Sequence, residues 1–207
     1  MTFEYEIARA QEHLASNDPV LAELIKVFGP PVLNPHGDHY KQLLSNIIGQ
    51  QLSVKAAASI RGRVFDFFGG KPTPQQLLAA DGDKLRSLGL SRAKVTYIKD
   101  LAQHMVDGRL DMGHISSLPN NELVEQLVGV KGIGEWSAHM FMIFGLGRLD
   151  ILPTSDLGVR KASMNLYKLR QLPSPQRLRK LSKQNGWAPY ESIVAWYLWE
   201  SLDNAPT

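Results

Sequence analysis

The sequence has 207 residues, 43% of them hydrophobic and 21% charged, which is typical of a folded globular chain. Its formal net charge of +3 permits an anionic partner such as nucleic acid without requiring one. The absence of cysteine excludes disulfides, thiolate nucleophiles and cysteine-ligated zinc or iron–sulfur sites. Neither a secretory signal nor a run of about 18 apolar residues is present. We therefore expect a soluble protein with no membrane partner, cytoplasmic and nucleoid-associated in a bacterium or nuclear in a eukaryote.

Helices are predicted along the first third of the chain from start signals and apolar spacing. Asp18 and Pro19 are a capping residue and a first helical residue for a helix over 20–28. Apolar residues at 43, 44, 47 and 48 predict a helix over 40–49. Ser53 caps the next predicted helix, which ends at the glycine pair 69–70.

The rest of the chain follows the same pattern. Thr73, Ser91 and Pro119 begin further helices, and the remaining predicted helices are 74–80, 83–88, 92–107, 137–144, 155–168, 174–185 and 189–202. No segment alternates polar and apolar residues over a strand length. The sequence therefore predicts an all-α protein in two blocks: a middle block over 35–152, and a second block made of 1–34 and 153–207.

The segment LVGVKGIGEWSAHMF, residues 127–141, places three glycines between two predicted helices. Glycine permits the positive φ angles of a tight hairpin, and the second helix begins near Gly134. The N–H groups of Gly132, Gly134 and Glu135 then point outward and can bind a phosphate, with Lys131 adding a positive charge. The carbonyls that end the first helix could hold a monovalent cation. The alternative for a single glycine pair is an ordinary helix connection with a glycine cap.

The full pattern L-x-G-V-x-G-I-G-x-x-S-A resembles the helix-hairpin-helix motif, here at about 123–141. With IIGQQLSVKAA at 47–57 and LPTSDLGVRKA at 152–162, the chain resembles the helix-hairpin-helix (HhH-GPD) DNA glycosylase superfamily. Within it, the chain looks most like the alkylpurine, or 3-methyladenine, DNA glycosylase II branch. This resemblance implies an all-α fold with two helical subdomains flanking a DNA-binding cleft. Some relatives carry an N-terminal β domain, for which this chain is too short.

The resemblance assigns the chemistry to Asp156, about twenty residues after the hairpin. We expect Thr154 or Ser155 to cap a helix and Asp156 to lie in its first turn, where the helix dipole favours an ionised carboxylate. Breaking an N-glycosidic bond develops oxocarbenium character on the sugar, which a carboxylate stabilises while it orients or deprotonates water. Asp150 is the rival carboxylate and is interpreted as a loop residue.

Trp136 stands where family members that also cleave the backbone carry a nucleophilic lysine. We therefore expect a monofunctional enzyme that leaves an abasic site. Alkylated purines such as 3-methyladenine and 7-methylguanine are cationic, and an aromatic face attracts a cation. The resemblance places the base pocket at Trp136, Trp196, Met140 and Tyr40. Trp199 is interpreted as core packing, and Met140 lies where some relatives place an aromatic residue.

The target base must leave the stack, and a side chain must fill the gap. The matching turn in the family indicates Leu90 as the wedge, with Ser91 as the alternative. The resemblance adds Gln50, Gln51 and Ser53 near the lesion, although Ser53 could serve only as a helix cap. We expect phosphate contacts from Arg160, and more loosely from Lys161, Arg92 and Lys94.

These expectations describe a base excision repair enzyme that acts on double-stranded DNA with damaged bases, as a monomer. Two alternatives remain open: a glycosylase for another damaged or mismatched base, and a non-catalytic DNA-damage-binding module. No cofactor is expected to be required. A structural Na⁺ or K⁺ at the hairpin, held by the backbone carbonyls of Val128, Val130 and Ile133, is the one ion that the resemblance suggests.

Overall fold

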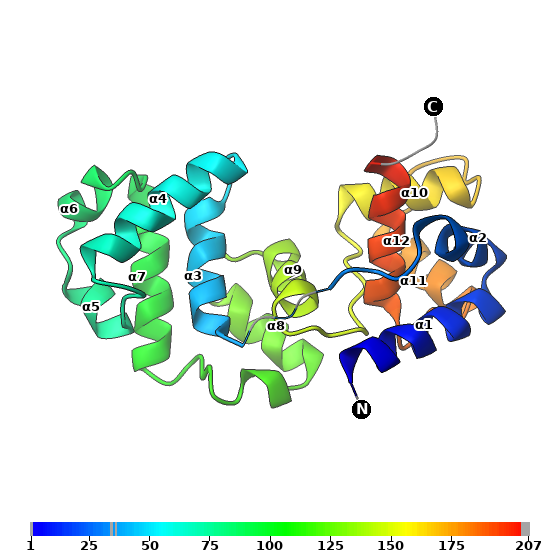
Figure 1. The fold of residues 1–207 in the computed structure, drawn as a ribbon, viewed down its shortest axis with the longest axis horizontal. Helices are drawn as coiled ribbons and strands as arrows, with labels where there is room; N and C mark the ends of the chain where they lie inside the picture. The colour runs from blue at the N-terminus through cyan, green and yellow to red at the C-terminus, as the bar shows by residue number, and fades with distance from the viewer. Residues whose placement is uncertain (1, 34, 36, 204–207) are drawn as a thin grey trace. The chain divides into compact units, whose positions relative to one another are not determined.

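The structure, a computed structural model, describes residues 2–33, 35 and 37–203, in which helices are joined by loops and turns. These residues form twelve α-helices and one short 3-10 helix, with no strand among them, so the predicted all-α class is confirmed (Figure 1). The helices are α1 (Phe3–Asn17), α2 (Pro19–Phe28), α3 (His39–Gly49), α4 (Val54–Phe67), α5 (Pro74–Ala79), α6 (Gly82–Ser87), α7 (Arg92–Val106), η1 (Ile115–Ser117), α8 (Asn120–Val128), α9 (Glu135–Phe144), α10 (Leu157–Leu166), α11 (Pro175–Gln184) and α12 (Glu191–Asp203).

Several helices begin where the sequence supplies a capping side chain. Asp18 accepts a hydrogen bond from the backbone N–H of Val20 at the start of α2. Ser53 and Ser91 cap α4 and α7 in the same way. Each cap satisfies an N–H that has no partner inside its own helix, which explains why these starts were predictable from local sequence.

The contacts divide the chain into two compact units, each described here by itself. The terminal unit comprises the residues up to Pro35 together with those from Met142 onward, and the middle unit comprises the residues between them. The second boundary lies earlier than the predicted 152. Phe144 packs against Trp199 with ring centroids 5.8 Å apart, and the carbonyl of Leu149 accepts the N–H of Ser192 at 2.8 Å. These contacts bind the 142–152 segment to α12.

Helix α7 is the central element of the middle unit. It packs against α3, α5 and α6, and α3 in turn packs against α4. Its residues Ile98 and Leu101 are fully buried, together with Leu44 and Ile47 of α3. Because α7 begins at the 88–91 turn, its rigidity fixes the geometry of that turn.

Helix α12 is the core element of the terminal unit. It packs against α1, α2 and α10, and its Tyr197 is fully buried. The Tyr197 hydroxyl donates to the carbonyl of Gly29 at 2.6 Å and accepts from Gln11 at 2.9 Å. The N-terminal helix α1 and the end of α2 are thereby joined to α12 in one core. Within the described residues, every helix is too short or too polar to cross a lipid bilayer.

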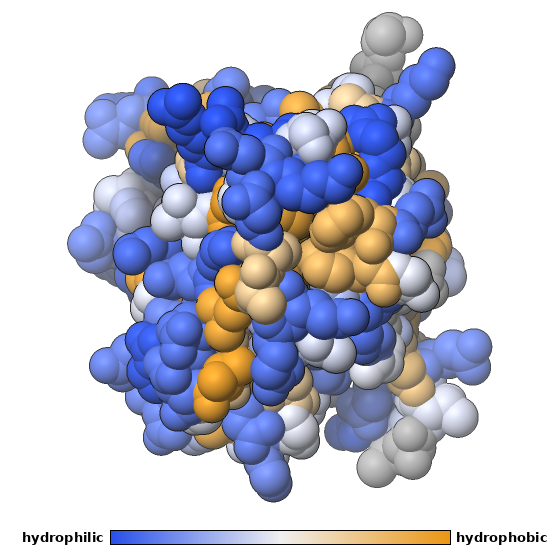
Figure 2. Space-filling view, turned by 90° about the vertical axis from the view of Figure 1, so that its left-hand side faces the viewer, coloured by the Kyte–Doolittle hydropathy of each residue, from blue (hydrophilic) through white to orange (hydrophobic). Residues whose placement is uncertain are grey.

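The face of the middle unit that carries α4, α5 and α6 is mostly hydrophilic, with an apolar band through its centre (Figure 2). Phe67, at the end of α4, is 43% exposed and packs edge-on against Phe68. The ammonium of Lys84 lies 5.4 Å from the Phe67 ring centroid, close enough for a cation–π contact. A neighbouring cation therefore partly covers this exposed ring.

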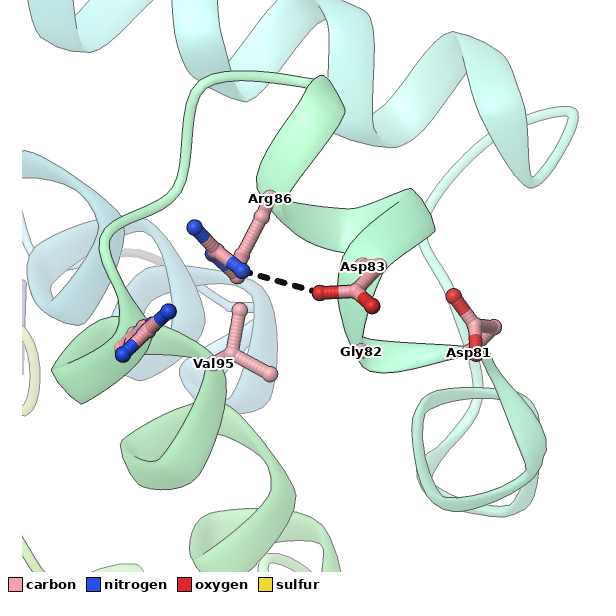
Figure 3. Close-up of a pocket in the computed structure, with 6 residues that line it drawn as sticks. Asp81, Gly82, Asp83, Arg86 and Val95 are labelled. Carbon is pink, nitrogen blue, oxygen red and sulfur yellow. Dashed lines mark hydrogen bonds and ion pairs between the residues drawn. The ribbon is translucent and has the colours of Figure 1, made fainter.

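A hollow of about 400 Å³ opens between α6 and the start of α7 (Figure 3). Asp83 and Arg86 face each other in an ion pair of 2.9 Å, and Asp81 and Arg92 add one charge of each sign. None of the predicted base-pocket residues lines this hollow, and its charges balance. The hollow therefore lacks the features of a base or phosphate site.

Candidate active site and nucleic-acid interface

The glycine-rich segment forms the predicted hairpin between α8 and α9. Gly132 has a φ of +85°, a conformation that favours glycine, and the N–H of Ile133 closes the turn by donating to the carbonyl of Val130 at 3.0 Å. An added Cβ at Gly132 would lie 2.3 Å from the ring of Tyr97, so a side chain there has no room. Glycine is thus required at this position both by conformation and by close packing.

The N-terminus of α9 presents backbone donors. Across the described residues, the N–H groups of Gly132, Gly134 and Glu135 donate to no protein acceptor. An added Cβ at Gly134 would meet nothing within 4 Å, so the space above it is open. Free N–H groups with open space at the positive end of a helix are suited to binding a phosphate.

Lys131 lies in the turn, as expected from sequence, and is paired with an acidic side chain. Its backbone N–H donates to the Asp100 carboxylate at 2.8 Å, and its ammonium lies 3.5 Å from the other carboxylate oxygen. The side chain remains largely exposed, so it can still approach a phosphate, but a paired acid offsets its charge.

The suggested cation site at Val128, Val130 and Ile133 remains a prediction. The Val130 carbonyl already accepts the N–H that closes the turn, and a carbonyl oxygen has one further lone pair for an ion. Within the described residues, no cluster of three or more His, Asp or Glu side chains could hold a metal.

Asp156 is itself the N-cap of α10, which corrects the expected cap at Thr154 or Ser155. Its backbone is extended, with φ −67° and ψ 125°, and its Oδ1 accepts the N–H of Val159 at 2.7 Å. The side chain of Thr154 is buried two residues earlier and makes no such bond. The carboxylate therefore sits directly at the positive end of the helix dipole, at the cap position and not within the first turn.

Trp199 holds the same carboxylate from α12. Its indole N–H donates to Asp156 Oδ1 at 2.9 Å, so two donors converge on one oxygen. Gly158 makes room for this contact, because an added Cβ would lie 3.0 Å from Trp199 and 3.1 Å from Asp156 Oδ1. The interpretation of Trp199 as core packing alone is wrong: it is a hydrogen-bond partner of the candidate catalytic group.

The aromatic residues assigned to the base pocket have different surroundings. Trp136 is 51% exposed at the start of α9, with the partly exposed Met140 one turn further along. Trp196, on α12, is partly exposed and packs edge-on against Tyr197. The exposure of Trp136 suits a residue that receives a ligand, whereas the pocket role of Trp196 remains a prediction.

Tyr40 is buried near the N-terminus of α3. Its hydroxyl has no hydrogen-bond partner among the described residues, and the Lys71 ammonium lies 5.5 Å from its ring centroid. Burial, with a smaller contribution from the Asp38 charge, raises the pKa of the Tyr40 hydroxyl well above its usual value. Tyr40 therefore carries a neutral hydroxyl with unused hydrogen-bonding capacity, as a base-pocket residue would.

Leu90 is not available as a wedge in this structure. Its side chain is only 4% exposed and belongs to the core of the middle unit. Gly89, before it, has a φ of +108°, and Arg63 donates to the carbonyl of Leu88 at 2.8 Å. The turn is thereby fixed with Leu90 facing inward, because burying its apolar side chain is favourable. Ser91 caps α7 through the N–H of Lys94.

The turn between α3 and α4 offers an exposed alternative. Gln51 has a φ of +56°, an uncommon conformation for a residue with a side chain, and it is exposed. Gln50 donates from its amide to the carbonyl of Gly132 at 2.8 Å, which joins this turn to the hairpin. Ser53 is the cap of α4, the simpler of its two predicted roles.

Two of the expected phosphate ligands make internal contacts. Arg160 donates through Nε to the carbonyl of Pro173 at 2.8 Å, and the Lys94 ammonium donates to the carbonyl of Ile48 at 2.7 Å. Burial lowers the pKa of Lys94. Both side chains therefore stabilise the fold, and a phosphate contact by either remains a prediction.

Sequence reasoning missed Trp199, Gly158 and Asp100. The pattern VAWYLW contains two tryptophans three residues apart, and nothing local shows which one faces α10. For Asp100, the available signal was its spacing on α7: Tyr97, Asp100 and His104 recur at helical intervals and so share a face.

Comparison with known proteins agrees with this arrangement. Residues 44–187 match the HhH-GPD superfamily, described as base excision DNA repair protein. The chain is similar to the alkylbase DNA glycosidase-like protein mag2 of Schizosaccharomyces pombe, at 32% identity over 97% of this chain and 96% of that protein.

Two solved structures are similar in fold and sequence. The DNA-3-methyladenine glycosidase of Bacillus halodurans superposes with a TM-score of 0.84 at 35% identity, covering 93% of this chain and 88% of that one. The 3-methyladenine DNA glycosylase Mag1 of Schizosaccharomyces pombe, in complex with abasic DNA, gives 0.78 at 32% identity, covering 95% and 98%.

Proposed function

Since the chain belongs to the HhH-GPD superfamily of base excision DNA repair proteins, we propose that it is a DNA glycosylase that hydrolyses alkylated purines from duplex DNA. The observation that carries the proposal is the Asp156 carboxylate, placed at a helix N-cap, whose Oδ1 accepts the N–H of Val159 and the indole N–H of Trp199. The hairpin with its free N–H groups supplies the phosphate contacts that position such an enzyme on the duplex.

Asp156 supplies the negative charge that the reaction needs. As the bond between sugar and base lengthens, positive charge develops on the sugar ring, and a fixed carboxylate stabilises it. The same group orients or deprotonates the attacking water. The indole N–H of Trp199 and the N–H of Val159 fix the carboxylate before the substrate arrives, which reduces reorganisation during the reaction.

Water is the nucleophile, and the enzyme is monofunctional. The position after the hairpin that carries an amine in lyase members of the superfamily holds Trp136, so the Schiff base that begins strand cleavage cannot form there. The product is an abasic site. The exposed indole of Trp136 instead offers its face to a cationic base, a contact worth about 0.5 to 2 kcal/mol.

Gln51 fills the gap that the extruded base leaves. Gln51 takes the wedge role that the sequence assigned to Leu90, because Gln51 is exposed and can enter the DNA stack whereas Leu90 is buried. The hydrogen bond from Gln50 to the Gly132 carbonyl holds the turn between α3 and α4 beside the phosphate-binding N–H groups of the hairpin.

The decisive test is base release from duplexes that contain 3-methyladenine, 7-methylguanine or 1,N6-ethenoadenine. We expect free base to appear without strand cleavage until alkali is added, and no borohydride-trapped adduct. The Asp156→Asn variant should bind the same duplex and release no base.

Other results would redirect the assignment. Release only from a deaminated or mismatched base would keep the fold and mechanism but change the substrate class. Binding to lesions without any release by the pure wild-type protein would leave a DNA-damage-binding module. A trapped adduct would contradict the monofunctional mechanism.

A further inference from the structure

Three residues on one face of α7 lie against the hairpin. Tyr97 lies beneath Gly132, and Asp100 bonds to Lys131. His104 completes the face beneath Gly129, where its Nε2 would lie 3.7 Å from an added Cβ. Residues 97, 100 and 104 are spaced by three and four, so they form a continuous stripe on the helix.

Asp100 is the charged centre of this stripe. Its side chain is 18% exposed, and it contacts both the main chain and the side chain of Lys131: the N–H at 2.8 Å and the ammonium at 3.5 Å. A carboxylate that accepts a backbone N–H forms a charge-assisted hydrogen bond, roughly twice as strong as a neutral one. This bond fixes the peptide plane between Val130 and Lys131, one residue before the plane that carries the Gly132 N–H, one of the free donors.

His104 contacts Asp100 one turn further along α7, and Arg109 contacts His104. His104 Nδ1 lies 2.9 Å from the backbone carbonyl of Asp100, which requires Nδ1 to carry the proton. Nε2 is then an acceptor, and Arg109 donates to it at 2.8 Å. His104 Nδ1 is also 3.5 Å from the Asp100 carboxylate. The geometry of Asp100 is therefore supported by His104 on the same helix, which Arg109 holds in turn.

We propose that Asp100 is a positioning residue for DNA binding, which orients the phosphate-binding hairpin through its hydrogen bond to the Lys131 backbone N–H. The inference rests on the proposed function, because it assigns the hairpin donors to the DNA backbone. Asp100 acts through the turn and does not itself contact DNA. Its negative charge alone would repel a phosphate, so the charge effect and the positioning effect have opposite signs.

The experiment measures the Kd for a duplex with a tetrahydrofuran abasic-site analogue, at several salt concentrations, by fluorescence anisotropy. The variants are Asp100→Ala, Asp100→Asn, Lys131→Ala and the double variant Asp100→Ala with Lys131→Ala. Asp66→Ala, an exposed acid on α4, is the matched control for loss of one negative charge. The melting temperature of each variant reports folding.

If Asp100 acts by orienting the Lys131 backbone N–H, the variants should differ in Kd and not in excision rate. Asp100→Ala weakens binding about tenfold, the size expected for loss of a hydrogen bond to a charged group. Asp100→Asn stays within about threefold of wild type, since its amide oxygen still accepts the N–H. The tenfold loss persists in the Lys131→Ala background, and the salt dependence of Kd is unchanged. The single-turnover excision rate at saturating enzyme also stays unchanged, which a general structural defect would not allow.

Three results would overturn the proposal: tighter binding by Asp100→Ala, disappearance of its effect when Lys131 is absent, or an equal loss in Asp66→Ala. If Asp100→Ala does not fold, the test is amide hydrogen exchange of the wild-type protein. A rapidly exchanging Lys131 amide would contradict the hydrogen bond between the Lys131 N–H and the Asp100 carboxylate. Failure of the wild-type protein to bind the duplex at all would instead refute the proposed function.

Discussion

Two aspartates in the terminal unit have almost the same local structure and quite different surroundings. Asp18 caps α2 and Asp156 caps α10, and each also accepts an indole N–H, from Trp187 at 2.8 Å and Trp199 at 2.9 Å. Asp18 is fully buried, whereas Asp156 is 8% exposed. Local sequence therefore builds the same cap twice, and tertiary contacts decide what each carboxylate does.

The difference lies in how the carboxylate oxygens are used. In Asp18, Oδ1 accepts the backbone N–H groups of α2, while Oδ2 accepts the Tyr167 hydroxyl at 2.6 Å and the Trp187 indole. Burial, followed by the hydrogen bond to Asp18 and then by the Asp18 charge, raises the pKa of the Tyr167 hydroxyl far above its usual value, so it remains a donor. In Asp156, the bonds from Val159 and Trp199 both go to Oδ1. The Asp18 carboxylate therefore ties buried side chains of the core to the start of α2, whereas the Oδ1 of Asp156 is fixed by the start of α10 and by α12.

Replacement of Asp156 by Asn is the change with the largest expected effect on activity. Asn is as good an N-cap as Asp, so the melting temperature should change little. The negative charge opposite the developing oxocarbenium ion is lost, and the single-turnover excision rate should fall by roughly 10³-fold or more, the order expected when a general base or charge-stabilising group is removed. A rate within tenfold of wild type would show that another group supplies the charge.

The same replacement at Asp18 should give the opposite result. One oxygen becomes an NH₂ group, which must then face a buried donor from α2, Tyr167 or Trp187. We expect unfolding in urea to show a loss of about 2 to 4 kcal/mol, since buried donors are left unsatisfied. The excision rate per folded molecule should stay near wild type. An unchanged stability would mean that the Asp18 network contributes nothing net to the fold.

The contrast also shows what could be predicted from sequence. Capping is local, so the helix starts at Asp18, Ser53 and Ser91 were predicted and are observed. The hairpin and its free N–H groups followed from glycine spacing, whereas the catalytic role of Asp156 comes from the family resemblance and stays a prediction. Each of these depends on residues close together in the chain or on a motif with fixed spacing.

Features that depend on distant contacts were missed. Leu90 was expected to be exposed, but a turn residue faces inward or outward according to what packs beneath it, and here it is core. The partner of Asp156 was not apparent, because Trp199 comes from a helix 43 residues away. The domain boundary was too late for the same reason, since the contact between Phe144 and α12 is not visible in the local pattern.

A smaller effect is expected from removing only the indole N–H donors. Trp199→Phe keeps an aromatic ring beside Asp156 but loses the hydrogen bond, so the carboxylate is less well fixed. The excision rate should fall about tenfold, consistent with one lost hydrogen bond to a charged group, with a small change in melting temperature. Trp187→Phe is the matched control and should lower stability without lowering the rate per folded molecule. If both variants lose only stability, Trp199 has no positioning role.

The smallest effect is expected from Gly158→Ala, because a single methyl group tests how closely Trp199 must approach Asp156. The new Cβ would lie 3.0 Å from Trp199 and 3.1 Å from Asp156 Oδ1, so one of the two must move by a few tenths of an ångström. The excision rate should fall about threefold to fivefold, as expected for a weakened hydrogen bond. Alanine is a better helix former than glycine by up to about 1 kcal/mol, so the melting temperature should stay the same or rise.

Gly62→Ala in α4 is the control: it has open space around its Cβ and should gain stability with no change in rate. A rate loss of equal size in both variants would trace the effect to helix stiffness, and only a loss confined to Gly158→Ala supports an active site built on this close approach.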